Sequence, residues 1–508
     1  MKKDNPKPET RNSKPGTQSP KLKPLMFVGT GSDVGKSVIN AAFCRIFLQD
    51  GYSPAPFKAQ NMSLNSYASI EGLELGRAQA VQAEACGIPC LSAMNPILLK
   101  PTSHQKSQVV LNGKPMGDQT AREYFMKTDR GFLFSEAMKA WRSLDARYNP
   151  IVMEGAGSIS EVNLWDKDIT NMRVALETSS PTILIADIDR GGVFGSVYGT
   201  IKLLPEAERK LIKGILINKF RGDISLFEDG KKILEELTGV PVIGVVPYFT
   251  NIQVEQEDSV VIDYKRGSTD SGKINVAVVL LRHMSNFTDF NMLERMPEVN
   301  LYYSANPAEI AKADIVLVPG SKNTIADLIH LREQGLAKAI LQVADAGKGV
   351  YGICGGYQIM GEEIRDPNQV ESDVETMPGL GLLPVVTTLS KEKRTEQTHF
   401  HFQNKETLCS GYEIHMGQTK RMNGKALCKL EDGSEDGCLV SPKVWGTYLH
   451  GILDNKVVIE AMLEANQLKA DVAEFDYAAF KDEQYNKLAD HVRACVDLDY
   501  VYSVMKED

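Results

Sequence analysis

The sequence has no long apolar run, no CxxC cysteine pair and no excess of basic residues. No stretch approaches the about 20 consecutive apolar residues that a membrane-spanning helix needs. The lysines near the N-terminus are not followed by an apolar segment, so we expect neither a signal peptide nor a membrane partner. The formal net charge of −9 argues against general nucleic-acid binding, which usually needs a basic surface.

The eight cysteines are scattered along the 508 residues. A chain of this length can bury a core without disulfides, so we expect reduced thiols and a cytoplasmic protein. With 43% hydrophobic and 24% charged residues, the composition is that of a globular protein with two or three domains. The oligomeric state is left open by the sequence.

Three parts of the chain differ in their sequence pattern. Residues 1–23 are rich in Lys, Pro, Ser and Thr and have few large apolar side chains, which predicts a disordered tail. Short apolar runs then alternate with helix-length segments over residues 24–265 and again over 272–508, on either side of a polar, glycine-containing stretch. This alternation predicts an α/β fold class with two tandem domains, each a mostly parallel sheet flanked by helices.

The apolar runs also predict individual elements. Apolar residues at helical spacing in 481–505 predict a terminal helix that packs on the second domain. The predicted strands are 24–29, 151–154, 182–187, 214–219 and 242–247 in the first domain, and 274–281, 314–320 and 349–354 in the second.

A glycine-rich stretch, GTGSDVGKS, lies between an apolar run and a predicted helix. Glycines let backbone N–H groups curl around phosphates, and a helix N-terminus adds partial positive charge. Lys36 is expected to neutralise the β- and γ-phosphates of a nucleotide, and Ser37 to hold Mg²⁺. The spacing is one residue longer than the usual G-x4-G-K-[ST]. The predicted ATP-binding residues are Gly29, Thr30, Gly31, Gly35, Lys36, Ser37 and Asn218.

Two further residues near strand ends extend this prediction. Glu154 ends the apolar run 151–154, where a parallel sheet presents ligand groups, and is a second candidate for binding Mg²⁺. Asn218, in NKF, follows another strand and is placed to contact the base. Arg221 stands where the guanine-reading NKxD motif has Asp, which favours ATP, while the nearby Asp223 keeps GTP open.

Cys354 stands in GVYGICGGYQIMG, where an apolar run changes into a glycine-rich turn before a helix. This pattern is typical of a nucleophile elbow, in which glycines relieve crowding and the helix start lowers the thiol pKa. His450, which ends a second apolar run, is expected to accept the thiol proton. Taken singly, a core cysteine and a structural histidine are the alternatives. The predicted oxyanion donors are backbone N–H groups of Gly320, Ser321 and Gly355.

The longest motifs resemble known families. The second domain resembles the triad-type glutamine amidotransferases of the cobalamin-biosynthesis branch through VPGSKNT (318–324), YGICGGYQIMG (351–361), GYEIHMG (411–417) and WGTYLHGI (445–452). The first domain is similar to the dethiobiotin-synthetase-like ATPases, whose phosphate loop has the same longer spacing. Four motifs resemble the cobyric acid synthase family in particular: FKAQNMSLNSY (57–67), GRAQAVQA (76–83), MEGAGS…EVNLWDKDITNM (153–172) and ADIDRGGVFGSVYGT (186–200).

This resemblance implies a carbon–nitrogen ligase with glutamine as amido donor. It implies amidation of the b, d, e and g carboxylates of adenosylcobyrinic acid a,c-diamide to adenosylcobyric acid, with one glutamine and one ATP for each amide. Cys354 would release ammonia from glutamine, Lys58 would lie near the transferred phosphoryl group, and Asp166 near the substrate carboxylate. Asp168 and Glu161 are close alternatives to Asp166. The implied cofactors are ATP and Mg²⁺, and the implied partners are small molecules.

Two other functions stay open from the sequence. Cobyrinic acid a,c-diamide synthase has the same two-domain plan and amidates the a and c carboxylates. A non-catalytic P-loop regulatory ATPase with an inactive amidotransferase domain is the third candidate, and the intact Cys354 and His450 argue against it.

Many amidotransferases carry Glu two residues after the His, but Ile452 stands there, so the group that orients His450 is open. NFTDF (286–290) belongs to the family pattern and receives no chemical role.

Overall fold

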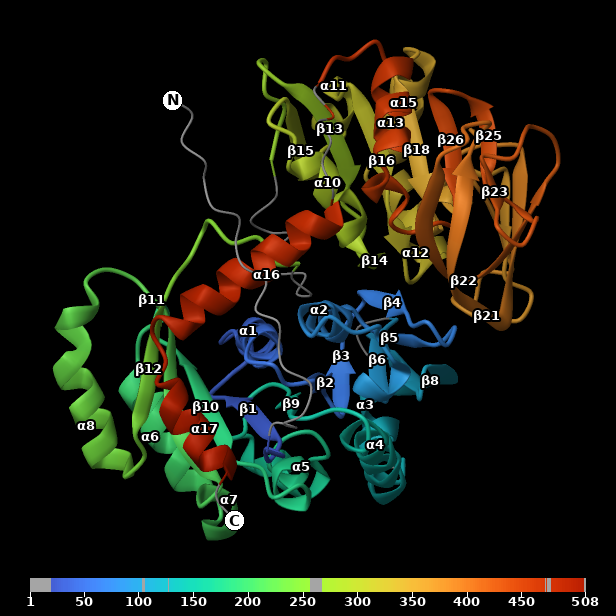
Figure 1. Ribbon diagram of the computed structural model, residues 1–508. Helices are drawn as coiled ribbons and strands as arrows, with labels where there is room; N and C mark the ends of the chain where they lie inside the picture. Colours follow the sequence, from blue (N-terminus) through green and yellow to red (C-terminus); the bar gives the residue numbers. More distant parts are fainter. Residues whose placement is uncertain are drawn as a thin grey trace, which may run out of the picture.

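The computed structural model describes residues 20–102, 106–126, 128–255, 267–470, 472 and 477–506. Within these residues the chain folds into two α/β domains that lie against each other (Figure 1). Each has a mostly parallel sheet with helices packed on it, which confirms the predicted fold class. Among the described helices, none is both long and apolar enough to cross a membrane.

The main sheet of the first domain is parallel throughout, in the order β12–β11–β10–β1–β9–β2. Along β1, Phe27 packs in one hydrophobic cluster, whereas Met26 and Val28 pack in another on the opposite face. Both faces are covered, which is why the strands are continuous apolar runs. The strands are β1 (Leu25–Gly29), β2 (Ala55–Phe57), β9 (Ile151–Glu154), β10 (Thr182–Asp187), β11 (Ile212–Phe220) and β12 (Val242–Pro247).

The helices of this domain follow the strands in the usual α/β alternation. They are α1 (Lys36–Gln49), α2 (Arg77–Ala85), α4 (Arg130–Asp145), α5 (Met172–Glu177), α6 (Val193–Leu203), α7 (Glu206–Arg209) and α8 (Glu228–Thr238), with 3₁₀ segments η2 (Val162–Lys167) and η3 (Ile224–Phe227).

An excursion between β2 and β9 adds a smaller sheet in the order β3–β6–β7–β8 and a two-stranded β4–β5 ribbon. In Figure 1 the ribbon and α2 lie on the side that faces the second domain. The excursion therefore places chain from the first domain between the two main sheets. Its elements are β3 (Gln60–Met62), β4 (Ser66–Ala68), β5 (Glu74–Gly76), η1 (Ser92–Met94), β6 (Ile97–Pro101), β7 (Lys106–Leu111), β8 (Lys114–Thr120) and α3 (Ala121–Met126).

The second domain has a sheet in the order β15–β13–β16–β18–β26–β25, parallel except for β25 at its edge. Its strands are β13 (Ile274–Val279), β15 (Val299–Ser304), β16 (Ile315–Val318), β18 (Gly349–Ile353), β25 (Cys438–Ser441) and β26 (Val444–Thr447), and a separate pair joins β14 (Met284–Ser285) to β17 (Gly320–Ser321). The helical segments are η4 (Phe287–Phe290), α10 (Asn291–Glu294), α11 (Pro307–Lys312), α12 (Thr324–Glu333), α13 (Leu336–Asp345), α14 (Gly355–Met360), η5 (Ile452–Asp454) and α15 (Lys456–Ala465).

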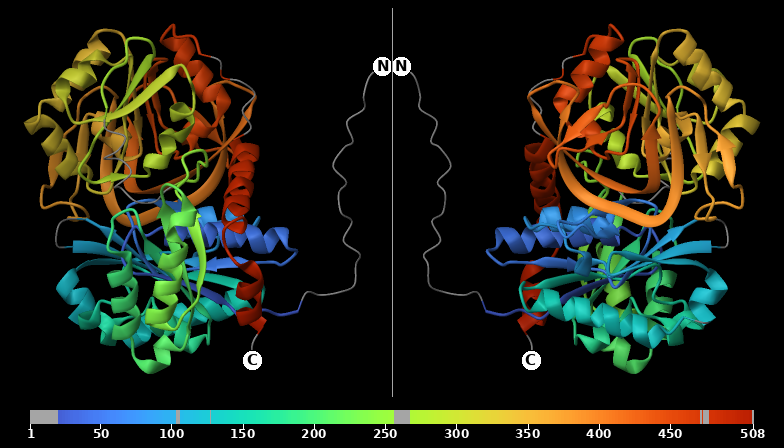
Figure 2. Two further views of the ribbon diagram at one scale, coloured as in Figure 1. Left: turned by 90° about the vertical axis from the view of Figure 1, so that its left-hand side faces the viewer. Right: turned by 90° about the vertical axis from the view of Figure 1, so that its right-hand side faces the viewer.

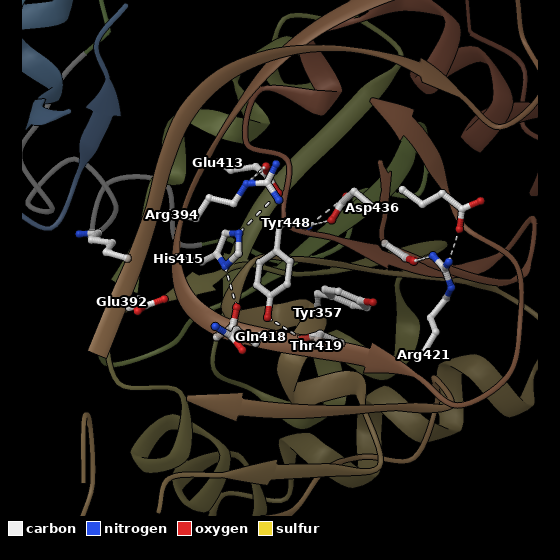
Figure 3. Close-up of a pocket in the computed structure, with 14 residues that line it drawn as sticks. Tyr357, Glu392, Arg394, Glu413, His415, Gln418, Thr419, Arg421, Asp436 and Tyr448 are labelled. Carbon is white, nitrogen blue, oxygen red and sulfur yellow. Dashed lines mark hydrogen bonds and ion pairs between the residues drawn. The ribbon is translucent and has the colours of Figure 1, made fainter. Parts of the chain in front are cut away.

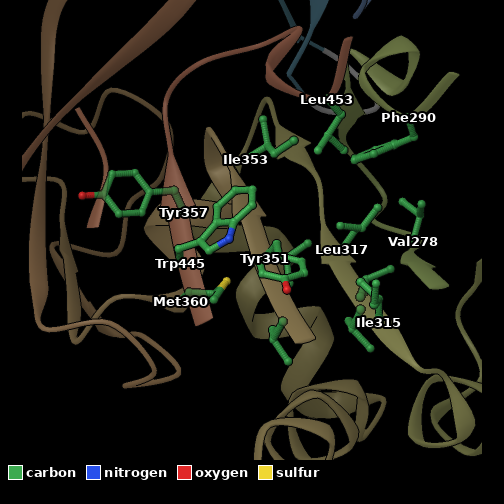
Figure 4. Close-up of a cluster of buried hydrophobic side chains, with 14 of the residues drawn as sticks. Val278, Phe290, Ile315, Leu317, Tyr351, Ile353, Tyr357, Met360, Trp445 and Leu453 are labelled. Atoms are coloured by element: carbon green, nitrogen blue, oxygen red, sulfur yellow. The ribbon is translucent and has the colours of Figure 1, made fainter. Parts of the chain in front are cut away.

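The core of the second domain, part of which is drawn in Figure 4, includes the predicted nucleophile Cys354 among its buried residues. Tyr351 on β18 lies opposite Trp445 on β26, and their ring centroids are 4.5 Å apart. Ile353, the last residue of β18, is 0% exposed. Burying an apolar side chain of this size stabilises the fold by roughly 1.5–3 kcal/mol. The strand end that precedes Cys354 is therefore firmly held.

A long antiparallel hairpin, β21 (Val385–Phe402) with β22 (Leu408–Arg421), curves along the side of the second domain that faces the first (Figure 2). Gln397 on β21 donates from Nε2 to the Ala68 carbonyl oxygen at 2.9 Å, and Lys393 forms an ion pair with Glu74. The hairpin therefore forms part of the domain interface. The remaining strands of its sheet are β19 (Glu363–Arg365), β20 (Thr376–Pro378), β23 (Cys428–Leu430) and β24 (Glu435–Asp436).

The C-terminal segment corrects one prediction. It forms two helices, α16 (Tyr477–Arg493) and α17 (Leu498–Lys506), whose apolar faces pack on the first domain, while Tyr477 at the start of α16 packs on the second (Figure 1). Leu488 and Val492 of α16 are buried in one cluster with Phe43 of α1. Helical spacing of apolar residues predicts a buried face, but it does not identify the surface that covers that face.

The predicted tail extends too far at its C-terminal end. Leu22 is 1% exposed, and its N–H donates to the Asn149 side-chain oxygen at 3.0 Å. Lys23 N donates to the Met505 carbonyl oxygen at 2.9 Å. These residues are anchored to the first domain, while residues 1–19 lie outside the described residues. The predicted domain boundary, 265–272, begins in residues 256–266, which also lie outside them.

Candidate functional site

The glycine-rich segment Gly29–Ser37 connects the end of β1 to the start of α1. Gly35 has φ 95°, in the left-handed region, and a Cβ there would overlap the amide of Asn218. Lys36 is 7% exposed, and its Nζ donates to the Gly31 carbonyl oxygen at 2.8 Å. A helix start and a buried cation therefore meet in one loop, as phosphate binding requires.

The loop is tied to the sheet below it. Thr30 N donates to the Ile185 carbonyl oxygen on β10 at 3.0 Å. Asn218 on β11 donates from Nδ2 to the Val34 carbonyl oxygen at 2.8 Å. Asn218 is 6% exposed and supports the loop from beneath, so its contact with a nucleotide base stays a prediction.

Glu154, at the C-terminal end of β9, is 1% exposed and surrounded by polar side chains. Lys58 Nζ lies 2.6 Å from Glu154 Oε1, and Ser37 Oγ donates to the same oxygen at 3.2 Å. From α2, Gln79 donates to Oε1 at 3.3 Å, and Gln82 to Oε2 at 3.1 Å. The structure thus brings together three predicted residues: Ser37, Lys58 and Glu154.

Gln79 and Gln82 were not singled out from the sequence. Their spacing places them on one face of α2, and that spacing within GRAQAVQA was the available signal.

The oxygens at the phosphate loop fit Mg²⁺. The Ser37 hydroxyl and the Glu154 carboxylate are hard donors of the kind that this ion takes. In the described part of the chain, no group of three or more His, Cys, Asp or Glu side chains is arranged to hold a metal ion. A few protein oxygens suffice where phosphates and water complete the Mg²⁺ coordination.

Asp166 lies in η2 with an exposed side chain. Its neighbour Trp165 donates from Nε1 to the Ile159 carbonyl oxygen at 2.9 Å, and Ile159 N donates to the Gly29 carbonyl oxygen at 3.2 Å. The alternative carboxylate, Asp168, instead accepts backbone N–H groups within its own turn. The η2 segment that carries Asp166 is therefore joined to the phosphate loop through Ile159, and the role of Asp166 stays a prediction.

Cys354 occupies the turn between β18 and α14, with φ 52° and ψ −107°. This conformation is strained for a residue with a side chain, and such strain clusters at functional sites. Gly356, in the same turn, packs so tightly that a Cβ there would overlap the Val318 carbonyl oxygen. The Cys354 N–H donates to the Thr447 carbonyl oxygen on β26 at 2.8 Å. This geometry fits a nucleophile elbow.

His450 is 1% exposed, and Asp289 holds its ring. His450 Nδ1 lies 2.7 Å from Asp289 Oδ2, and Gly451 N donates to Asp289 Oδ1 at 3.0 Å. Burial lowers the pKa of His450, but the charges of Asp289 and Cys354 and the hydrogen bonds to them raise it to about 10 overall. A protonated imidazole at neutral pH places a positive charge next to the Cys354 side chain.

Asp289 therefore completes a Cys–His–Asp arrangement that the sequence did not reveal. It lies in NFTDF, 161 residues before its partner, and not two residues after it, where Ile452 stands. The available signal was an acidic residue in an otherwise apolar and polar-neutral family motif near the first strand of the domain.

The predicted oxyanion donors meet beside this pair. Gly320 and Ser321 form β17, and a Cβ on Gly355 would lie 2.6 Å from Ser321 N. A Cβ on Gly320 would lie 3.5 Å from His450 Cε1. Backbone around Ser321 and Gly355 is therefore close enough to place N–H groups at one oxyanion.

A cavity of about 710 Å³ in the second domain is lined by residues of the β21–β22 hairpin together with Tyr357 and Tyr448 (Figure 3). Cys354 Sγ lies 3.7 Å from the carbonyl oxygen of Ile414, whose neighbours Glu413 and His415 line the cavity. Arg394 Nε lies 2.9 Å from Glu413 Oε2, so both charge signs face this space. The cavity is large enough, and polar enough, for a small zwitterion.

The first domain reaches the element that carries Asp289. Ser66 N donates to Asn286 Oδ1 at 3.0 Å, and Phe287 N donates to Asn65 Oδ1 at 3.3 Å. The excursion of the first domain and η4 of the second are thus hydrogen-bonded across the interface.

Comparisons with known proteins agree with this two-domain arrangement. Residues 25–260 match the CobQ/CobB/MinD/ParA nucleotide binding domain, and residues 275–458 match the CobB/CobQ-like glutamine amidotransferase domain. A protein from Phocaeicola vulgatus named cobyric acid synthase is 59% identical over 489 residues, which cover 95% of this chain and 98% of that protein.

Relatives with the same name occur in Parabacteroides distasonis, at 58% identity over 493 residues (96% of this chain, 99% of that protein), and in Streptococcus sanguinis, at 45% over 501 residues (96% and 99%). Identity at this level over nearly the whole chain shows the family. The chain belongs to the cobyric acid synthase family.

Proposed function

We propose that the protein amidates the b, d, e and g carboxylates of adenosylcobyrinic acid a,c-diamide to give adenosylcobyric acid, with glutamine as ammonia source and ATP as activator. One observation carries this proposal: a single chain holds a Cys354–His450–Asp289 arrangement in one domain and a Lys58–Glu154 pair beside a phosphate loop in the other. The names of its relatives support the corrinoid substrate.

The glutamine reaction is proposed for the second domain. The Cys354 thiolate attacks the carboxamide carbon of glutamine, and N–H groups of Ser321 and Gly355 stabilise the oxyanion. His450 donates its proton to the leaving nitrogen, so ammonia departs and a glutamyl thioester remains. Water then attacks the thioester as His450 takes its proton, which releases glutamate and restores the Cys354 thiolate and the protonated His450.

The polar cavity lined by Glu413 and Arg394 supports glutamine as the molecule bound in the second domain. Glu413 is placed to receive an α-ammonium group and Arg394 an α-carboxylate, since both face the same space. We assign these two side chains to recognition of glutamine.

The ligase reaction is proposed for the first domain. The γ-phosphoryl group of ATP passes to a corrinoid carboxylate oxygen and ADP leaves; ammonia then attacks the acyl carbon and phosphate departs. Lys36 and Lys58 neutralise charge on the phosphoryl oxygens, and Asp166 lies near the substrate carboxylate. Ser37 and Glu154 would hold Mg²⁺, which when bound neutralises further phosphate charge.

Exposed apolar side chains near this loop support a large, flat substrate. Met62 at the end of β3 is 58% exposed, and Val162 and Leu164 of η2 are 49% and 38% exposed. They flank elements that contact the nucleotide site, since Asn61 binds Gln79 and η2 is joined to the loop through Ile159. A corrin ring would cover such apolar surface.

The test is mass spectrometry of the corrinoid after incubation with purified protein, Mg·ATP and glutamine. Four successive acid-to-amide changes are expected. Cys354→Ala should abolish them with glutamine and restore them with added ammonia, because only the ammonia source is lost. Cys409→Ala, which changes another buried thiol of the same domain, serves as the matched control and should keep glutamine-driven amidation.

Two outcomes would contradict the proposal. Full glutaminase activity in Cys354→Ala would overturn the assignment of the nucleophile. An unchanged corrinoid despite active glutaminase would move the substrate elsewhere, first to cobyrinic acid and its a and c carboxylates.

A further inference from the structure

A line of aromatic rings crosses from the first domain to His450. The ring of Tyr67, on β4 of the first domain, has its centroid 4.5 Å from that of Tyr412 on β22. The ring of Tyr412 in turn stacks on His450, with centroids 5.3 Å apart and planes inclined by 23°. Contacts of this kind fix the relative position of rings as well as burying area.

Tyr412 holds His450 by its backbone as well as by its ring. Tyr412 N donates to the His450 carbonyl oxygen at 3.1 Å, and His450 N donates to the Tyr412 carbonyl oxygen at 2.8 Å. Asp289 binds one edge of the imidazole, while Tyr412 covers its face. The direction in which His450 meets Cys354 is therefore set by both neighbours.

Tyr67 is itself fixed by the first domain. The guanidinium carbon of Arg77 lies 4.5 Å from the centre of the Tyr67 ring. Arg77 is anchored in turn by Glu255, to which its Nε donates at 2.8 Å. Arg77 is the first residue of α2, the helix whose Gln79 and Gln82 bind Glu154. Helix α2 thus contacts the nucleotide site and also supports the stacked rings of Tyr67, Tyr412 and His450.

We propose that Tyr67 is a positioning residue for the glutamine reaction: through Tyr412 it keeps His450 aligned with Cys354, and it makes this alignment depend on the position of α2. The proposal rests on the proposed glutaminase function of Cys354 and His450. Its physical basis is that the reaction rate falls steeply when an acid–base group is displaced by about 1 Å from its reacting position.

A cavity of about 120 Å³ adds to the expected effect. It lies beside the stack and is lined by Tyr67, Tyr412 and Asp289 among others. Truncating Tyr67 would enlarge this space and leave the Tyr412 ring without its support. The Tyr412 ring, and with it the His450 ring that stacks on it, would then move more freely.

The experiment compares Tyr67→Leu, Tyr67→Phe and Gln397→Ala with the wild type, in glutamine-driven and ammonia-driven amidation of the corrinoid. Tyr67→Leu should lower kcat with glutamine about 10- to 100-fold, with little change in the KM for glutamine. Ammonia-driven amidation should stay within about twofold, because His450 takes no part in it. Tyr67→Phe keeps the ring and should retain near wild-type kcat.

Gln397→Ala is the matched control. It removes a hydrogen bond across the same interface, to Ala68 next to Tyr67. Gln397 lies opposite Tyr412 in the β21–β22 hairpin, and the substitution leaves the rings of Tyr67, Tyr412 and His450 in place. If Tyr67 only held the two domains together, Gln397→Ala would act like Tyr67→Leu, and ammonia-driven amidation would fall as well. This result would overturn the proposal. An unchanged kcat in Tyr67→Leu would also overturn it. Failure of the underlying function looks different: the wild type would then release no glutamate, or Cys354→Ala would keep releasing it.

Discussion

Asp289 Oδ2 lies 2.7 Å from His450 Nδ1, although 161 residues separate the two in the chain. Both side chains are 1% exposed, so water screens their interaction little. A buried imidazole alone would lose its proton more readily than one in water, because burial lowers its pKa. Asp289 reverses this tendency and makes an imidazolium stable next to Cys354.

We expect Asp289→Asn to move the pH dependence of glutamine hydrolysis. Without the carboxylate, only the interactions with Cys354 oppose burial, and the pKa of His450 falls from about 10 towards its usual value of 6.5. The loss of activity with rising pH should therefore shift from near pH 10 towards neutrality. At pH 8, kcat/KM for glutamine should fall about 100-fold, within the usual range for general acid–base groups.

The measurement is glutamate release as a function of pH, in the presence of corrinoid and Mg·ATP. Glu294→Gln removes an exposed acid from the next helix, α10, and should leave the profile unchanged. An Asp289→Asn profile that overlies the wild-type profile would show that Asp289 does not control the charge of His450.

Local sequence patterns were sufficient to predict the repeated units of the fold in which an apolar strand leads through a turn into a helix. The apolar runs at 151–154 and 182–187 became parallel strands, and the turns at Lys36 and Cys354 stand where strand–glycine–helix patterns place them. These signals depend only on neighbours in the chain.

Contacts between distant segments could not be predicted in the same way. Asp289, Gln79 and Tyr67 acquire their roles only when separate elements meet, and nothing in their immediate sequence shows the partner. The same limit explains why the apolar face of 481–505 was assigned to the wrong domain.

Lys58→Met should separate the two half-reactions. The substitution removes the cation that lies 2.6 Å from Glu154, in the site proposed for phosphoryl transfer. Ammonia-driven amidation of the corrinoid should fall by at least about 100-fold, because charge on the transferred group is no longer neutralised. Basal glutamine hydrolysis, which uses Cys354, should persist.

Lys139→Met is the comparison for that variant, since Lys139 is a surface lysine of α4 whose side chain is 68% exposed. It should amidate at the wild-type rate. Undiminished ammonia-driven turnover in Lys58→Met would remove Lys58 from the ligase site, whatever the glutaminase result.

Gly356→Ala should destabilise the second domain. The added methyl group would overlap the Val318 carbonyl oxygen, which belongs to the adjacent strand β16 and cannot move without shifting the sheet. We expect an overpacking cost of about 1–3 kcal/mol and a lower Tm. Gly199→Ala meets nothing within 4 Å in α6 and should raise stability by up to about 1 kcal/mol. Equal Tm values for both variants would contradict the tight turn.

The interface between the domains contains two lysines around one carboxylate. Lys100 Nζ lies 2.7 Å from Glu74, and Lys393 binds the same carboxylate from the second domain. Glu74 is 0% exposed, so one negative charge is shared by two buried cations. Burial is the largest cause that lowers the pKa of Lys393. The positive charges of Lys100 and Lys322 lower it further. Glu74 opposes these effects only in part, so the pKa of Lys393 is about 7.

This arrangement predicts that folding stability rises with pH above neutrality. The folded chain releases the Lys393 proton near pH 7, whereas the unfolded chain holds it up to about pH 10.5. Between these values the unfolded state binds more protons, so raising the pH favours the folded state by up to about 1.4 kcal/mol per pH unit. From pH 7 to pH 9 the wild type should gain about 2 kcal/mol relative to Lys393→Met, which lacks the titrating group.

Urea unfolding of both proteins at pH 7, 8 and 9 measures this difference, and taking the difference removes the titrations that both share. Lys391→Met provides the matched control, because Lys391 is an exposed residue of the same hairpin strand and its loss should leave the wild-type pH dependence intact. Parallel curves for the wild type and Lys393→Met would mean that Lys393 keeps its proton in the folded protein. Both lysines would then be charged around Glu74, and Lys393→Met should change the free energy of unfolding by the same amount at every pH.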